Sequence, residues 1–264
     1  MRRQPHGFEY TVILTTFRRT LHLAEALAGI ASQTLPPAQV IVADDGSGEP
    51  FESDNRRLAE QFGFVYLQLP HTGLPGLARD RALAMVSTPW VALSDDDDVW
   101  DADHIAVLSA AITDDSVIVA GNARRSDTGA DYRSASSESL DLIAEFPKNP
   151  VITSAALIRV SGLLQVGGFT PYPRGAEDYA AWLRLATVGS TVVVERPTIM
   201  YRITPGSLSA EASRGKRPLP LLCAADFLIW SYGKRLTLRR LPTKLWTLVM
   251  RRFLVRAASA LRDS

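Results

Sequence analysis

The alternation of short strand-like segments with helical segments is the strongest constraint on the fold of this 264-residue chain. Four runs rich in β-branched residues are bounded by Pro, Gly or Asp, and the stretches between them show helical spacing of apolar residues. This β-α-β-α order predicts an α/β fold with a largely parallel, doubly wound sheet. The predicted strands are Tyr10–Thr16, Val40–Ala43, Val65–Leu69 and Trp90–Leu93, and the predicted helices are Thr20–Ser32, Phe51–Phe62 and Leu77–Val86.

The second half of the chain has a less regular pattern. Its polar segments 122–139 and 204–220 are expected to be surface loops, because they are rich in Ser or in Pro and Gly. Ligands of doubly wound sheets bind beyond the carboxyl ends of the strands, so the loops after the strands are where chemistry is expected. Further strands are predicted over Val117–Ala120, Val151–Arg159 and Thr191–Val194, and further helices over Ala102–Ile112 and Glu177–Thr187.

Charge divides the chain into two parts. Residues 1–213 carry 17 Lys/Arg and 26 Asp/Glu, whereas residues 214–264 carry 12 Lys/Arg and two Asp. We therefore predict a domain over 1–213 and a basic helical tail over 214–264. Within the tail, residues 241–262 place apolar and basic side chains on opposite faces of a helix. Such a helix could lie on an anionic membrane surface, pack on the acidic domain, or mediate a homodimer. Nucleic acid is not an expected partner, since no recognised binding motif accompanies the basic residues.

Composition excludes several classes of protein. The 46% hydrophobic and 22% charged content is typical of an ordinary globular protein. Cys223 is the single cysteine, so no disulfide framework is possible, and a reducing cytosol is the expected compartment. We find no signal peptide and no run of the roughly 18 apolar residues that would span a bilayer. The expected location is cytoplasmic, with peripheral attachment to the inner face of the membrane if the tail binds lipid.

Two acidic clusters follow predicted strands. Asp44–Ser47 comes after Val40–Ala43, where a carboxylate could accept hydrogen bonds from a base or ribose; an Asx-turn before a helix is the alternative. Asp95–Asp98 comes after Trp90–Leu93, and four adjacent carboxylates favour a hard divalent cation such as Mg²⁺ or Mn²⁺. The alternative there is a solvated acidic loop in which Asp101 caps the next helix.

A third acidic pair, Glu177 and Asp178, begins a predicted helix. The helix dipole alone favours acidic residues at this position, but the same placement would hold a carboxylate firmly enough for a general base. Arg202, in the segment before Pro205-Gly206-Ser207, could pair with a diphosphate or simply belong to a loop.

Taken in order, these motifs resemble glycosyltransferase family 2, the inverting enzymes with the GT-A fold, in which a Rossmann-like, mostly parallel sheet is flanked by helices. The resemblance covers about residues 8–210 and does not include the tail. The residues that carry it are Thr16-Phe17, Asp44–Ser47, Gly73 with Ala78-Arg79, Asp95–Trp100, Gly167–Phe169, Glu177-Asp178 with Trp182 and Arg184, and Tyr201-Arg202 with Ser207 and Ser209.

The resemblance implies roles for individual residues. Asp178 would be the general base, and a divalent metal, Mn²⁺ or Mg²⁺, would be held by Asp95 and Asp97; the pair Asp96 and Asp98 also satisfies the metal pattern. The acceptor side would include Gly168, Glu177 and Trp182. The nucleotide sugar would be bound by Thr16, Phe17, Arg19, Asp45, Arg79, Asp95, Asp96 and Arg202, with Phe17 and Asp45 at the base and the arginines Arg79 and Arg202 near the phosphates.

Three positions depart from the family pattern. Family members often carry Asn at the positions of Arg18 and Asp80, and His at the position of Thr204. A threonine is a poor replacement for an imidazole ligand, so this difference bears on how a metal shell would be completed.

These observations predict an inverting, metal-dependent glycosyltransferase that moves a sugar from a nucleotide-diphosphate donor, a UDP-sugar by family resemblance, to a hydroxyl acceptor. The acceptor could be a glycan or a lipid-linked molecule of a cell-envelope polysaccharide. One alternative is a noncatalytic nucleotide-sugar-binding or scaffold protein. A nucleotidyltransferase is less favoured, because Thr15–Arg19 contains no glycine where a phosphate-binding loop would need one.

Overall fold

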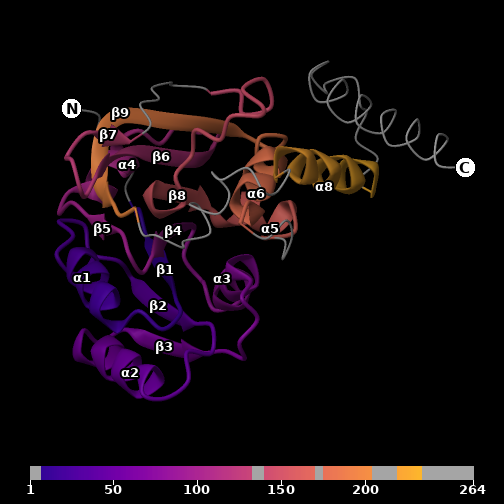
Figure 1. The fold of residues 1–264 in the computed structure, drawn as a ribbon. Helices are drawn as coiled ribbons and strands as arrows, with labels where there is room; N and C mark the ends of the chain where they lie inside the picture. Colours follow the sequence, from indigo (N-terminus) through magenta and orange to yellow (C-terminus); the bar gives the residue numbers. More distant parts are fainter. Residues whose placement is uncertain (1–6, 133–139, 170–174, 204–218, 234–264) are drawn as a thin grey trace, which may run out of the picture.

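A single curled sheet runs through the computed structural model, which describes residues 7–132, 140–169, 175–203 and 219–233 (Figure 1). The strands lie in the order β3-β2-β1-β4-β8-β6-β9-β5, and β7 pairs with β6. In Figure 1 they run from β3 near the bottom to β9 along the top. Their bounds are β1 (Tyr10–Thr16), β2 (Gln39–Asp44), β3 (Val65–Gln68), β4 (Trp90–Asp95), β5 (Val99–Trp100), β6 (Ser116–Arg125), β7 (Asp131–Tyr132), β8 (Ala156–Arg159) and β9 (Ser190–Tyr201).

The first half of the sheet is parallel, as the β-α-β-α order predicts. Strand β1 lies between β2 and β4, and both pairings are parallel. Thr16 is paired with Asp44, and Thr15 is paired with Asp95. The two acidic clusters at the ends of β2 and β4 therefore meet at one edge of the sheet, as the parallel order of these strands predicts.

The second half of the sheet is mixed, and it corrects two sequence predictions. Strand β8 is antiparallel to both β4 and β6, whereas β9 is parallel to β6. The predicted strand Val151–Arg159 is a strand only over β8, because residues Thr153–Ala155 form the 3₁₀ turn η1. The predicted loop 122–139 is wrong in its first part, since β6 continues to Arg125 and pairs there with β7.

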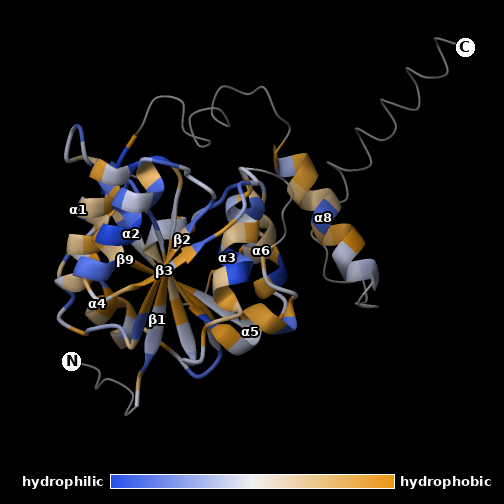
Figure 2. Ribbon diagram, turned by 90° about the horizontal axis from the view of Figure 1, so that it is seen from below, coloured by the Kyte–Doolittle hydropathy of each residue, from blue (hydrophilic) through white to orange (hydrophobic). Residues whose placement is uncertain are grey.

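Helices cover both faces of the sheet (Figure 2). Along β1, Ile13 packs into one buried cluster while Val12 and Leu14 pack into the other, as expected for a strand buried on both faces. Helices α1, α2 and α4 belong to the second cluster, and α3, α5 and α6 to the first. The helices are α1 (Thr20–Ala31), α2 (Phe51–Gln61), α3 (Pro75–Leu83), α4 (His104–Ala110), α5 (Val160–Gln165), α6 (Glu177–Leu185) and α8 (Leu219–Gly233).

Helix α8 lies in the stretch that the charge pattern assigns to a basic tail. Its residues Cys223, Ala224 and Phe227 are buried in the same cluster as α6. Among the described residues, no helix combines the length and apolar character that a bilayer crossing requires. The predicted domain boundary at 213/214 and the predicted amphipathic helix over 241–262 fall outside the described residues, so both stay predictions.

Candidate active site

A cleft of about 420 Å³ opens at the carboxyl edge of β1, β2 and β4. Residues from both halves of the sheet line it, because the antiparallel β8 and the start of α6 approach the same edge. The structure brings together in this cleft the predicted donor-side, metal and base residues Thr16, Phe17, Arg19, Asp45, Arg79, Asp95, Asp96, Asp97, Asp178 and Arg202. Glu177, predicted on the acceptor side, also lines the cleft.

The four carboxylates Asp95–Asp98, at the end of β4 and just after it, have different surroundings. Asp96 is buried and accepts a hydrogen bond from Thr16 Oγ1 at 2.7 Å, and its burial raises its pKa to about 7. Burial also raises the pKa of Asp98, whose Oδ1 accepts from the Arg202 backbone N–H at 3.0 Å. The side chains of Asp95 and Asp97 are more accessible, at 34% and 12% exposed. The alternate carboxylates 95 and 97 thus present oxygen atoms to the cleft.

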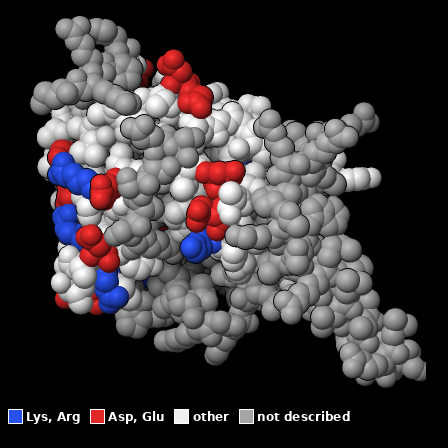
Figure 3. Space-filling view, turned by 90° about the horizontal axis from the view of Figure 1, so that it is seen from above, with Lys and Arg blue, Asp and Glu red and all other residues white. Residues whose placement is uncertain are grey.

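Arginine side chains neutralise these accessible carboxylates. Arg19 Nη1 lies 2.5 Å from Asp97 Oδ2, and Arg79 Nη2 lies 2.7 Å from Asp95 Oδ1. Figure 3 shows acidic and basic side chains next to one another on the described part of one face of the molecule. Arg202, predicted near the phosphates, lines the cleft and pairs through Nη2 with the Glu25 carboxylate on α1.

An aromatic pair forms one wall of the cleft. The rings of Phe17 and His71 stack with centroids 4.3 Å apart and an interplanar angle of 15°. Asp45 holds the loop that carries His71, because its carboxylate accepts from the backbone N–H groups of Thr72 at 3.0 Å and Gly73 at 2.7 Å. Sequence analysis missed His71; its only signal is an aromatic ring two residues before Gly73.

Glu177 and Asp178 begin α6 but do different things. Glu177 is buried, accepts from Arg79 Nη1 at 3.1 Å and accepts from the Gly175 N–H at 2.8 Å. Asp178 is half-buried and lines the cleft, and its two oxygens accept from Thr153 Oγ1 and from the Tyr179 N–H, each at 2.7 Å. The Glu177 carboxylate is therefore held in a buried ion pair, while the Asp178 carboxylate is more accessible from the cleft.

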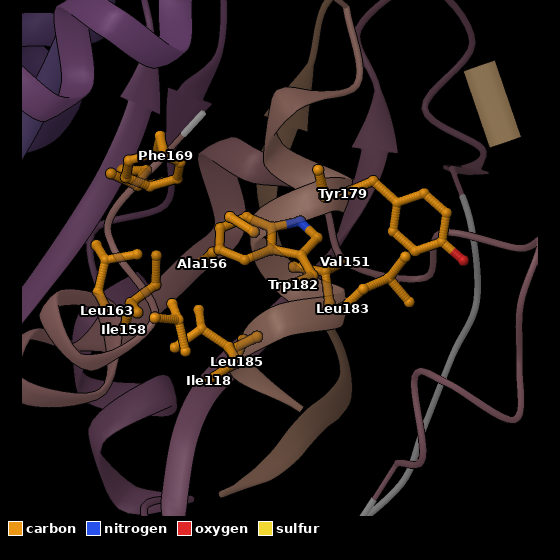
Figure 4. Close-up of a cluster of buried hydrophobic side chains, with 14 of the residues drawn as sticks. Ile118, Val151, Ala156, Ile158, Leu163, Phe169, Tyr179, Trp182, Leu183 and Leu185 are labelled. Carbon is orange, nitrogen blue, oxygen red and sulfur yellow. The ribbon is translucent and has the colours of Figure 1, made fainter. Parts of the chain in front are cut away.

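Two residues predicted on the acceptor side do not line the cleft. Trp182 is one helical turn beyond Asp178 and is fully buried. The Phe169 ring packs edge-on against it, with ring centroids 6.0 Å apart (Figure 4). The Gly168 carbonyl accepts a hydrogen bond from Arg184 Nη2 at 3.2 Å. Trp182 points into the core because the inner face of α6 packs against the sheet, and Gly168 lies in the segment after α5.

Gly168 has a structural task that gives a first prediction. Its φ is +73°, and an added Cβ would lie 2.5 Å from Asp80 Oδ1, whereas at Gly167, with φ +89°, a Cβ would meet nothing within 4 Å. The positive φ should cost each of G168A and the control G167A about 1 kcal/mol of the free energy of unfolding, and G168A should lose more because the Asp80 carboxylate must also move. Urea denaturation measures both, and equal losses would contradict the proposed clash.

Asp80, where family members often carry Asn, gives a pH-dependent prediction. Burial raises its pKa to about 6, and its Oδ1 accepts from the Phe169 N–H at 2.7 Å. The folded state therefore favours the protonated form, and this contribution to stability is lost as the pH rises from about 4 through 6. In D80N the amide oxygen can still accept the bond. The free energy of unfolding of D80N relative to that of wild type is expected to increase by about 1 kcal/mol between pH 4.5 and 7.5. A pH-independent difference in urea denaturation would refute this.

Solved structures that share this architecture include a mannosyltransferase, and the fold is the GT-A fold. S. aureus TarS 1-349 in complex with UDP superposes with a TM-score of 0.66 at 18% identity, covering 84% of this chain and 66% of that one. The mannosyltransferase PcManGT from Pyrobaculum calidifontis, in complex with GDP-Man and Mn²⁺, superposes with a TM-score of 0.62 at 18% identity. The superposition covers 99% of this chain and 90% of PcManGT.

The sequence itself gives the family. The family model described as Glycosyl transferase family 2 matches residues 11–177, so the chain belongs to glycosyltransferase family 2. It is also 38% identical over 87 residues to the succinoglycan biosynthesis protein ExoW of Rhizobium meliloti (strain 1021). That match covers 31% of this chain and 27% of the relative, so the chain spans only part of the ExoW protein.

Proposed function

We propose that the protein is an inverting glycosyltransferase that moves a sugar from a nucleoside-diphosphate donor to a hydroxyl acceptor. The observation that carries this is the position of Asp178, a held and accessible carboxylate in the same cleft as Asp95 and Asp97. TarS has been solved with UDP and with UDP-GlcNAc, and PcManGT with GDP-Man, which supports a nucleotide-sugar donor. We favour a UDP-sugar.

The residues after β4 fit a divalent cation. Within the described residues, no group of three or more His, Cys, Asp or Glu side chains is arranged so that it alone could hold a metal ion. Two accessible carboxylates, Asp95 and Asp97, suit Mg²⁺ or Mn²⁺, which take one or two carboxylates and complete their shell with diphosphate oxygens and water. A metal held there would supply neutralisation of the charge that develops on the leaving diphosphate. The Mn²⁺ in the PcManGT structure supports this choice.

The chain's own groups supply the remaining steps. The wall formed by Phe17 and His71 would hold the nucleotide base by stacking, and Arg19 would turn toward the diphosphate. Asp178 would accept the proton of the acceptor hydroxyl as that oxygen attacks the anomeric carbon from the face opposite the diphosphate. A single displacement needs no protein nucleophile. Burial raises the pKa of the Cys223 thiol, which argues against covalent catalysis by that residue.

The surface of α8 supports a glycan or lipid-linked acceptor at a membrane surface. On α8, Ile229 and Tyr232 are 75% and 84% exposed, directly before the basic segment 234–264. Exposed apolar side chains beside basic residues favour an anionic bilayer. Flotation with phosphatidylglycerol vesicles but not with phosphatidylcholine vesicles would support this; a homodimer that leaves anionic vesicles unbound would refute it.

Calorimetric titration with UDP, GDP and dTDP, each with Mn²⁺ and again with EDTA, tests the donor proposal. Metal-dependent binding of one nucleotide would identify the donor class. Release of that nucleotide from its sugar conjugates, followed by NMR of the product anomer, would then test transfer and inversion. Folded protein that binds none of the three would refute a nucleotide-sugar donor. Binding without turnover on any acceptor would favour the noncatalytic alternative.

A further inference from the structure

The 3₁₀ turn η1 connects two parts of the cleft that are far apart in sequence. Because β8 runs antiparallel to β4, η1 lies beside the carboxyl end of β4. The Asp95 backbone N–H donates to Ser154 Oγ at 3.1 Å, and Trp100 Nε1 donates to the Ser154 carbonyl at 2.7 Å. Ser154 thereby holds both ends of the acidic loop that begins at Asp95.

The preceding residue holds the carboxylate that we assign as the base. Thr153 is 9% exposed, lines the cleft and donates from Oγ1 to Asp178 Oδ2 at 2.7 Å. The other oxygen, Oδ1, accepts from the Tyr179 N–H at 2.7 Å. Two donors from different elements fix the plane of this carboxylate, and each oxygen keeps a second lone pair to accept a proton.

We propose that Thr153 is the positioning residue of the general base Asp178, and that η1 sets the position of the Asp178 carboxylate relative to the donor-binding loop. This inference rests on the proposed function. Thr153 and Ser154 are neighbours in one short turn. Thr153 binds the Asp178 carboxylate and Ser154 binds the donor-binding loop at Asp95, so the distance between the general base and that loop is fixed locally. A general base works only when held in a narrow range of geometry, and a carboxylate free to rotate loses much of that benefit.

A purely structural role predicts a different result. If the Thr153 hydroxyl only satisfied the start of α6, its loss would lower stability and leave the turnover of folded enzyme unchanged. If it positions the base, turnover falls while donor binding is retained. The ratio of the effect on kcat to the effect on KM separates the two roles.

The test compares T153V, T153S and a matched control, T191V. Thr191 is buried in β9 and its hydroxyl has no hydrogen-bond partner among the described residues, so T191V makes the same chemical change without removing a contact. We expect T153V to lower kcat for nucleotide release by about 10- to 100-fold, part of what a general base contributes. T153S should restore most of the loss, T191V should match wild type, and UDP affinity with Mn²⁺ should stay within about twofold throughout.

A second measurement keeps the inference distinct from the proposed function. In a D178N background, T153V should cause no further loss, because the hydroxyl acts through the carboxylate. If D178N itself retains turnover, the base assignment fails; if D178N loses turnover and T153V does not, only the role of Thr153 fails. T153A removes the same hydroxyl without adding a methyl group next to Asp178, and it decides the question should T153V not fold.

Discussion

The D178N variant is expected to lose turnover by about 10²- to 10⁴-fold, the usual contribution of a general base, while UDP affinity in the presence of Mn²⁺ changes by less than about twofold. The amide has nearly the same shape as the carboxylate but cannot take up the acceptor proton. Its oxygen can still accept from the Tyr179 N–H while its NH₂ group donates to Thr153 Oγ1, since a hydroxyl can accept as well as donate, so the start of α6 should stay in place. Initial rates of nucleotide release and calorimetry on the same preparation measure the two quantities.

The control for this prediction is D127N, the same substitution at an exposed position. Asp127 pairs with Arg125 Nη2 at 2.7 Å on the surface and does not line the cleft. The D127N variant should therefore keep the wild-type turnover and UDP affinity. If the turnover of D178N were within a few-fold of that of D127N, Asp178 would be excluded as the general base. Glu177, the other carboxylate at the start of α6, would then be the favoured candidate.

Much of the site could be predicted from the sequence, because it depends on parallel strands. Strands β1, β2 and β4 are continuous apolar runs that end in polar residues, and parallel neighbours bring those ends to one edge. That is sufficient to place Asp45 and Asp95 in one cleft. The buried ion pair between Glu177 and Arg79 was not predictable, since the two residues are distant in sequence.

The mixed half of the sheet was harder to predict for physical reasons. Val151–Arg159 has a strand-like composition, and η1 forms within it because Ser154 is tied to the Asp95 backbone and to Trp100. In β6, Asn122 suggests a loop but is buried in the sheet, where Nδ2 donates to the Glu195 carbonyl at 2.8 Å. In both cases long-range hydrogen bonds override a local preference.

The second large effect is expected for stability, at the arginine that connects the two halves of the cleft. The Arg79 side chain is 5% exposed and lies between Asp95 Oδ1 at 2.7 Å and Glu177 Oε1 at 3.1 Å. R79M keeps much of the volume but leaves the buried Glu177 without its counter-charge. Removing one partner of a buried ion pair typically costs about 3–5 kcal/mol, so the free energy of unfolding should fall by that amount at pH 7. The control R57M removes an exposed pair with Asp54 and should cost less than about 1 kcal/mol.

The pH dependence of R79M identifies the cause of the loss. Burial raises the pKa of Glu177 while Arg79 opposes that rise, so the pKa should rise further in R79M. A carboxyl group with a raised folded-state pKa stabilises the protein most when protonated, and that contribution disappears as the pH rises through the folded pKa. The deficit of R79M should therefore shrink as the pH falls from 7 toward 5, because Glu177 can take up a proton in place of its lost partner. Urea denaturation at pH 5, 6 and 7 measures this trend; a constant deficit would mean that Arg79 stabilises the fold by packing and not by its charge.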